Sequence, residues 1–223
     1  MKLIEVIYTL LIIGILANTT WFAYSFSTTN NTQAALTTLY ALQRTRMLAL
    51  IDHSKLGYVG FGDIYEFARV DSKRLITNNT PFYWQLQFHT SGIYTKNSLS
   101  IYRDTPRFAS TTDFDRRPLA GDIVALHVGS TQCLSGYNNS NITGFCKDNA
   151  LIDFRLHETT KIQTLALHTS ITCQERDTFR FYFNDYGSIL CGLRIHEPQG
   201  LQRILVGNIY IAIEPKTGYA FLE

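Results

Sequence analysis

The chain has 223 residues, of which 45% are apolar and 17% charged, a balance that excludes intrinsic disorder and favours one globular domain. Its 20 basic and 18 acidic residues leave a net charge of +2, which excludes the strongly basic character of a dedicated nucleic-acid-binding protein. Phe and Tyr are abundant and Pro is scarce, as is typical of half-buried strands. Composition therefore predicts a sheet-rich body and indicates no partner.

The N-terminal segment, residues 3–24, is largely apolar, and Glu5 is its only ionisable side chain apart from tyrosine. As a helix it would span roughly 33 Å, which is enough to cross a bilayer. A cleavable secretory signal is the alternative interpretation. However, Trp21, Phe22 and Tyr24 continue the apolar character where a signal would end in small residues, and aromatic side chains suit a membrane interface. The pattern favours a retained anchor.

Glu5 is unusual in such a segment, because a carboxylate at the bilayer centre costs about 2.5–3.5 kcal/mol, and less near a helix end. Its position near the terminus would allow the side chain to reach the cytoplasmic headgroups. The other interpretation is that Glu5 pairs with a cation on another subunit when such helices pack together.

The run Leu-Ile-Glu-Val at residues 3–6, followed by Leu-Ile-Ile-Gly-Ile-Leu-Ala at residues 11–17, resembles the start of mature type IV pilins and type II secretion pseudopilins. In that family the first mature residue is N-methylated, and a glutamate at the fifth position neutralises the α-amino group of a neighbouring subunit. Met1 and Glu5 stand in those places, so the resemblance implies assembly roles for both and processing with N-methylation at Met1. Met1-Lys2 replaces the usual Phe-Thr, and the short basic leader of the family is not in this sequence, so we expect either a translation start further upstream or different processing.

Two further segments are similar to the GspH/FimT group of minor pseudopilins and minor pilins. Residues 39–50, with Arg46 and Ala49, resemble a helix segment of that group, although Thr45 stands where the group prefers Ala. Residues 179–183, which lead to a glycine turn, resemble its late strand.

The resemblance implies a minor pseudopilin or minor pilin that assembles into a type II secretion or type IV pilus-like filament. Its expected partners are other pilins or pseudopilins, through the N-terminal helix, together with an inner-membrane assembly platform and prepilin peptidase. The expected location is a single pass through the cytoplasmic (inner) membrane, with the C-terminal domain in the periplasm or outside the cell. Assembly involves no turnover, so no enzymatic activity is expected. The alternative is a FimT-like minor pilin that binds DNA during natural transformation.

The sequence divides into a transmembrane and assembly helix at 1–24, a linker and continuing amphipathic helix at 25–54, and a β-rich globular periplasmic domain at 55–223. Polar residues at 25–32 predict a loosening of the helix, and helical spacing resumes from 33 to about 53. We expect this second helix to lay one apolar face on the sheet. The residues at that spacing are Leu36, Leu39, Tyr40, Met47, Leu50 and Ile51.

Beyond Pro81, strand-like runs alternate with turn sequences, and no intervening helical pattern suggests a parallel sheet. The predicted fold class is α+β, with a long, pilin-like, hydrophobic N-terminal helix packed at its C-terminal half on a mostly antiparallel sheet domain. The predicted strands are residues 82–88, 99–102, 122–128, 151–157, 162–168, 178–183 and 208–213.

Cys133, Cys146, Cys173 and Cys191 form an even set in the segment expected outside the cytoplasm, where disulfides persist. Four cysteines allow three connectivities, and we expect the sequential one, 133 with 146 and 173 with 191. Each bridge is expected to stabilise the fold by about 2–4 kcal/mol. A zinc site is disfavoured because the sequence has no CxxC and no closely spaced Cys/His pair.

The 6 histidines are dispersed, without an HExxH or a neighbouring ligand cluster, and no GxSxG elbow accompanies them. No catalytic residue, metal or cofactor is therefore expected.

Basic residues interleaved with aromatic ones are candidates for nucleic-acid contact. Solvated loops with local aspartate partners are the alternative for these positions. DNA-binding relatives of FimT carry arginine in a C-terminal region where residues 216–221 offer only Lys216, which disfavours DNA binding. The candidate contacts are Lys73, Arg74, Arg103, Arg107, Arg116 and Arg117.

Overall fold

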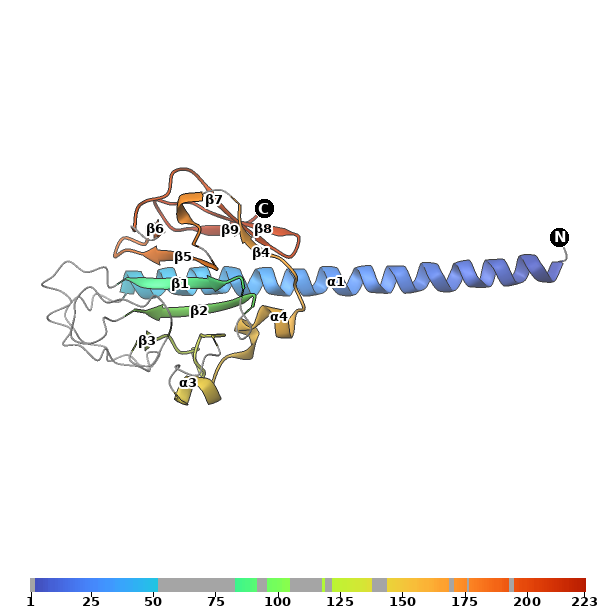
Figure 1. Ribbon diagram of the computed structural model, residues 1–223, viewed down its shortest axis with the longest axis horizontal. Coiled ribbons are helices and arrows are strands. Elements are labelled where there is room, and N and C mark those ends of the chain that lie inside the picture. Colours follow the sequence, from blue (N-terminus) through green and yellow to red (C-terminus); the bar gives the residue numbers. More distant parts are fainter. Residues whose placement is uncertain are drawn as a thin grey trace, which may run out of the picture.

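A computed structural model shows a long helix, α1, with the remaining described elements gathered around its C-terminal half (Figure 1). Within the helix, side chains are described at positions 12, 13, 15, 16 and 29–51. The structure describes residues 3–51, 83–91, 96–104, 118, 122–137, 144–168, 171–175, 177–192 and 195–223.

Helix α1 (Leu3–Ile51) is continuous, so the loosening expected at residues 25–32 is not found. Asn and Thr are weak helix formers, but each costs less than about 0.7 kcal/mol relative to Ala. Between Gly14 and Gly57 the sequence contains neither Gly nor Pro, so no residue removes a helical hydrogen bond. Continuity therefore follows from the absence of a breaker.

The expected membrane anchor is contradicted. In the part of the chain that the structure describes, no helix combines the length and the apolar character needed to cross a membrane. The predicted single-pass inner-membrane location and the membrane-spanning helix of the predicted fold class are corrected accordingly.

One antiparallel sheet has the strand order β3-β2-β1-β5-β6. In its centre Leu86 of β1 lies opposite Ile101 of β2 and Phe181 of β5. Its strands are β1 (Trp84–His89), β2 (Ser98–Arg103), β3 (Ile123–Val124), β5 (Thr178–Phe183) and β6 (Ile189–Cys191).

A second antiparallel sheet has the order β4-β7-β8-β9. The strands of the predicted antiparallel sheet domain are thus divided between two sheets. The two sheets are linked where the backbone N–H of Ile189, in β6, donates to the carbonyl oxygen of Pro215, in the loop after residue 213, at 2.8 Å. The strands are β4 (Leu165–Leu167), β7 (Gln202–Val206), β8 (Ile209–Ile213) and β9 (Ala220–Leu222).

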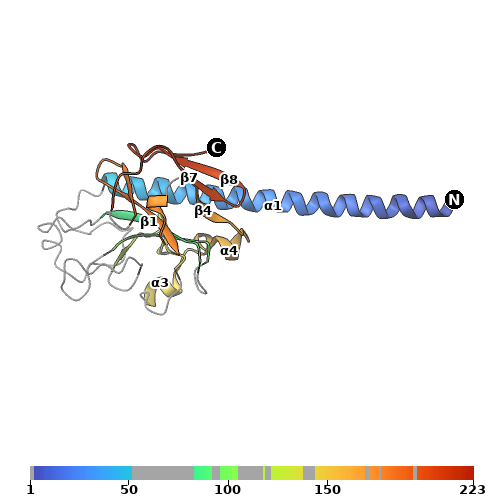
Figure 2. The same cartoon turned by 45° about the horizontal axis from the view of Figure 1, so that its top comes forward.

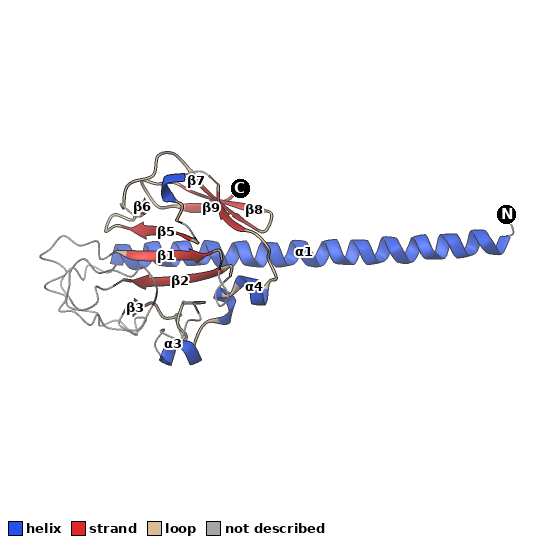
Figure 3. Cartoon of the chain, in the orientation of Figure 1, coloured by secondary structure: helices blue, strands red, loops and turns tan. Residues whose placement is uncertain are grey.

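Residues 151–157, predicted as a strand, are instead two short helical turns (Figure 3). Phe154 and Leu156 are both buried, and this alternation imitates a strand in the sequence. The N–H of Phe154 instead bonds locally to the carbonyl oxygen of Leu151 at 3.0 Å. The short helices are α3 (Gly144–Asp148), η2 (Ile152–Phe154), α4 (Leu156–Thr159) and η3 (Ile171–Cys173).

Helix α1 packs on both sheets through small side chains. Alanine on this face lets the helix backbone approach the strands, and the hydroxyls of Thr38 and Thr45 bond to the carbonyl oxygens four residues earlier. The large apolar residues expected on this face are mainly on the outside, including Leu36 at 50% and Ile51 at 55% exposed. The buried face consists of Ala34, Ala35, Thr38, Ala41, Leu42, Thr45, Leu48 and Ala49.

The core between α1 and the first sheet is aromatic. Alternate residues of β1 and β5 point to this side, because successive strand side chains point to opposite faces. Phe88 stacks on Phe179 with ring centroids 4.3 Å apart and meets Phe181 edge to face at 6.2 Å. The core fixes the helix against the sheet and leaves the outer side of α1 uncovered by the described strands.

Candidate interaction surface

The N-terminal part of α1 extends away from the folded body, and the two views in Figures 1 and 2 agree on this arrangement. Ile12, Ile13, Ile15 and Leu16 are each between 53 and 61% exposed. Large aliphatic side chains concentrated on a projecting helix indicate an interaction surface, because contiguous exposed apolar residues are uncommon on monomeric proteins. We call these four residues the stem cluster.

A second apolar surface lies on the same helix beside the folded body. Leu36, Tyr40, Met47 and Ile51 are exposed large residues, and we call them the outer stripe. At 100° per residue these positions fall within about 60° of one another, opposite the face that meets the sheets. A shallow hollow of about 480 Å³ at Thr29, Thr32, Gln33, Leu36 and Thr37 adjoins the outer stripe. Beside the folded body, α1 thus has apolar residues both on the face that meets the sheets and on the opposite, exposed face.

The residues to which the family resemblance assigned assembly are only partly placed. Glu5 lies within α1, but its side chain is outside the described part of the structure. Met1, expected to carry the N-methyl group, lies outside the described residues altogether. Pairing of Glu5 with a neighbouring subunit therefore stays a prediction.

Of the predicted nucleic-acid contacts, only Arg103 is within the described residues. Its side chain is 5% exposed and its guanidinium carbon lies 5.0 Å from the ring centroid of Trp84. A buried cation stacked on an aromatic ring is a packing element, and it presents no charge to a phosphate backbone. The candidates outside the described residues are Lys73, Arg74, Arg107, Arg116 and Arg117.

The structure contains the disulfides Cys133–Cys146 and Cys173–Cys191, which confirms the expectation of two bridges and has the sequential connectivity. The first closes the segment that leads into α3. The second joins η3 to the end of β6, so it fixes an edge strand of the first sheet. Both bridges hold irregular segments against the sheets.

A buried polar network covers the side of the first sheet that faces away from α1. Arg180 forms two 2.7 Å bonds with the carboxylate of Glu175, and its third nitrogen lies 3.2 Å from Gln85 Oε1 and 3.3 Å from the Tyr102 hydroxyl. That hydroxyl in turn donates to Gln87 Oε1 at 2.7 Å. All three guanidinium nitrogens of Arg180 and the Tyr102 hydroxyl thus have partners, as burial requires.

The network controls the ionisation of two of its members. Burial raises the pKa of Tyr102 well above its usual range, although the charge of Arg180 partly opposes this shift. Burial disfavours the charged form of Arg180, but Tyr102, Tyr182 and Glu175 outweigh it and leave the pKa of the guanidinium raised. Arg180 thus remains charged in the interior.

A second buried group contains a Ser–His contact that sequence reasoning did not find. His89 Nε2 lies 3.1 Å from Ser100 Oγ, which lies 3.0 Å from Ser135 Oγ. All three side chains are buried, and the His89 ring packs 5.0 Å from that of Tyr137. Because these side chains are buried, a substrate cannot reach them. Their mutual contacts satisfy polar groups on this face of the sheet. The three residues come from distant parts of the chain, so no local motif could reveal them.

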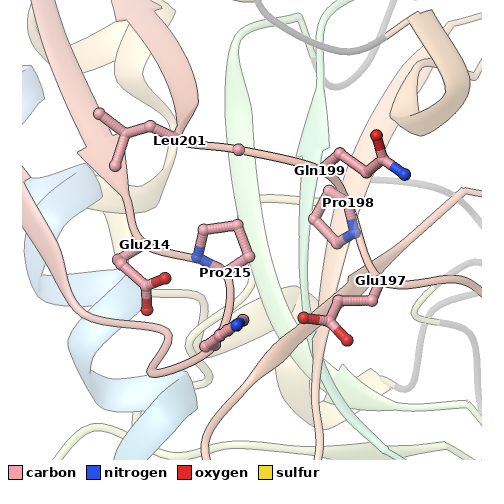
Figure 4. A pocket seen from close by; sticks show the side chains of 8 residues that line it. Glu197, Pro198, Gln199, Leu201, Glu214 and Pro215 are labelled. Carbon is pink, nitrogen blue, oxygen red and sulfur yellow. The ribbon is translucent and has the colours of Figure 1, made fainter.

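An open groove of about 570 Å³ lies between two loops, residues 197–201 and 214–216 (Figure 4). Glu197 and Glu214 point into it from opposite sides. Glu214 accepts hydrogen bonds from the Thr217 hydroxyl at 2.8 Å and its backbone N–H at 2.6 Å, and the hydroxyl contact lowers the pKa of this carboxyl. Each wall of the groove carries a glutamate, and Lys216 lies on the wall of Glu214.

Comparison with known proteins identifies no relative. No family model matches the chain, and neither the curated proteins nor the solved structures include a significant match.

Proposed function

We propose that this protein is a filament subunit of the minor pseudopilin or minor pilin type, in which α1 packs against the helices of neighbouring subunits. The observation that carries the proposal is the stem cluster on a helix that projects from the folded body (Figure 1). The resemblance of residues 3–6 and 11–17 to the start of pilins and pseudopilins supports the same assignment.

Burial energetics favour such packing. Removing apolar surface from water stabilises an interface by about 25 cal/mol per Å², and a second helix could cover the stem cluster at a usual interaxial distance of about 8–10 Å. Each large aliphatic side chain that becomes fully buried contributes about 1.5–3 kcal/mol. Several such side chains on every subunit would each contribute to packing between neighbouring helices, against the cost of association.

The outer stripe adds a separate apolar surface beside the folded body. Its four residues lie opposite the face that contacts the sheets, so neighbouring helices can pack there without disturbing the core. Tyr40 also contacts His127, with ring centroids 6.4 Å apart, which holds one member of the stripe in place. A subunit built in this way offers contacts on both the projecting and the body-bound halves of α1.

The experiment measures incorporation of the full chain into filaments sheared from the source cells. Ile12→Asn combined with Ile15→Asn removes two members of the stem cluster, and Tyr186→Asn is the control, because Tyr186 is 84% exposed in the loop after β5. We expect incorporation to fall at least tenfold for the double variant and to be unchanged for the control, with equal amounts of folded protein in the cells. Equal incorporation of the double variant, or a wild-type chain absent from every filament fraction, would contradict the proposal.

A further inference from the structure

A tight hairpin after β6 places a cysteine and a histidine side by side. The N–H of Cys191 donates to the carbonyl oxygen of His196 at 2.8 Å, and the N–H of His196 donates to that of Cys191 at 3.0 Å. Two residues that exchange both backbone hydrogen bonds are directly opposite, and their side chains share one face. His196 Nε2 consequently lies 3.9 Å from Cys191 Sγ.

Helix η3 brings a third ligand atom to the same point, because Cys173 ends this helix and is joined to Cys191. The two sulfurs and a ring nitrogen of His196 all lie within 4.8 Å of one another. Gly192 permits this approach: its φ is +74°, and a Cβ there would lie 2.5 Å from the carbonyl oxygen of Thr172. In the oxidised chain the Thr172 hydroxyl lies 3.0 Å from His196 Nε2 and orients the ring, and this contact is given up when that nitrogen binds an ion.

We propose that the reduced form of this pair binds one Zn²⁺ ion through Cys173, Cys191 and His196. Two thiolates and one imidazole are a ligand set that zinc prefers. With Zn–S bonds of about 2.3 Å, a tetrahedral ion needs the sulfurs roughly 3.8 Å apart, a separation that small side-chain rotations provide once the disulfide is open. His196 is only half-buried, so water can take the fourth position.

The exchange between disulfide and metal is balanced. A dithiol reductant gives two electrons to the Cys173–Cys191 bond and becomes a disulfide itself, which leaves two thiols on the protein. Zn²⁺ then displaces the two thiol protons as it binds, and the neutral imidazole of His196 gives its lone pair. Reoxidation by a disulfide reverses both steps and releases the ion. The same residues therefore act as a redox-dependent zinc site.

The other disulfide provides an internal control. Among the residues that the structure describes, the group around His196 is the single set of three potential ligands, so Cys133 and Cys146 have no such histidine nearby. Removing those two cysteines should leave zinc binding intact. His168 is a control for the histidine, because it packs against Tyr210 at 5.4 Å in the second sheet.

The experiment uses the full chain, reduced anaerobically with a water-soluble phosphine, and Zn²⁺ alone as the probe. Affinity is measured by competition with a chromogenic chelator, and Co²⁺ substitution reports thiolate ligation by its charge-transfer absorption. His196→Gln retains a polar partner for Thr172 while removing the imidazole, and His168→Gln and the pair Cys133→Ser with Cys146→Ser are the controls. Near-UV circular dichroism reports whether the loaded protein is folded.

We expect one Zn²⁺ per reduced chain, at least a tenfold weaker affinity for His196→Gln, and unchanged affinity for both controls. The oxidised chain should bind none. Equal affinity of His196→Gln and wild type overturns the proposal, as does binding that survives Cys173→Ser with Cys191→Ser. A reduced chain that loses its near-UV signal and does not regain it with Zn²⁺ overturns it as well.

Discussion

Arg180 and Glu175 form a two-bonded ion pair in the interior, with both N···O distances at 2.7 Å and side-chain exposures of 2% and 9%. The pair anchors the polar side of the first sheet, because Arg180 also reaches Gln85 and Tyr102. A charge held in this way depends on its partner, since removal of one member leaves the other buried and uncompensated.

Glu175→Gln should therefore be strongly destabilising. We expect the free energy of unfolding to fall by about 3–5 kcal/mol, as measured by urea denaturation. The matched control is Glu223→Gln, which breaks the exposed ion pair with Arg203 and should change stability little. Equal losses in the two variants would show that the Arg180 pair has no special role.

The orientation of α1 can be tested by two substitutions, one that enlarges a buried side chain and one that shortens an exposed side chain. Ala41 is completely buried against the sheets, so Ala41→Leu should overpack this contact and lower the free energy of unfolding by about 1–3 kcal/mol. Leu36→Ala removes an exposed side chain and should remain within about 0.5 kcal/mol of wild type. Chemical denaturation of both variants measures the difference, and the reverse order would mean that the large apolar residues face the core.

Alkaline stability should depend on Tyr102. Burial raises its pKa in the folded chain above the ordinary value of 10.0, so the folded state holds the proton more tightly than the unfolded state. The contribution is complete below pH 10 and is lost as the pH rises through the folded pKa. Tyr102→Phe should be less stable than wild type at pH 8, with a gap that narrows above pH 10 in urea titrations. A gap that stays constant up to pH 11 would contradict this assignment.

Glu214 should contribute stability that is lost as the pH falls, whereas the contribution of Tyr102 is lost as the pH rises. Its pKa lies below the ordinary 4.5 because Thr217 donates to the carboxylate, so the group stabilises the fold above that value and the effect disappears as the pH falls. Glu214→Gln should lower the melting temperature at pH 7 and approach wild type near pH 3. Glu197→Gln, on the other wall of the groove, is the control, and an equal pH dependence for it would refute the role of Thr217.

Local sequence patterns predicted much of the strand content. Residues 178–183 form a strand over the predicted range, and β1, β2 and β8 lie within one or two residues of the predicted ends. These strands carry aromatic and β-branched residues between turn sequences, and that pattern acts locally. Strands β6, β7 and β9 were not predicted, and residues 151–157 imitated a strand because two buried positions alternate.

The orientation of α1 could not be predicted, because helical periodicity shows which residues share a face but not which face meets the sheet. The apolar outer stripe gave the stronger signal, whereas the buried face contains mainly Ala and Thr, whose small size allows close approach, with Leu42 and Leu48 beside them. The expected membrane anchor was contradicted because, in the described part of the chain, no helix is long and apolar enough to cross a membrane.

The sequence by itself determined the presence of a helix before a strand-rich region and provided four cysteines able to form two bridges. Tertiary structure alone decided which sheet each strand joins, which side of α1 is covered, and which polar groups meet in the interior. Arg180 hydrogen-bonds to Gln85, which is 95 residues away in the sequence. Cys173 lies close to His196 only because η3 and the hairpin after β6 converge. Such contacts depend on chain folding over long separations, and no local propensity encodes them.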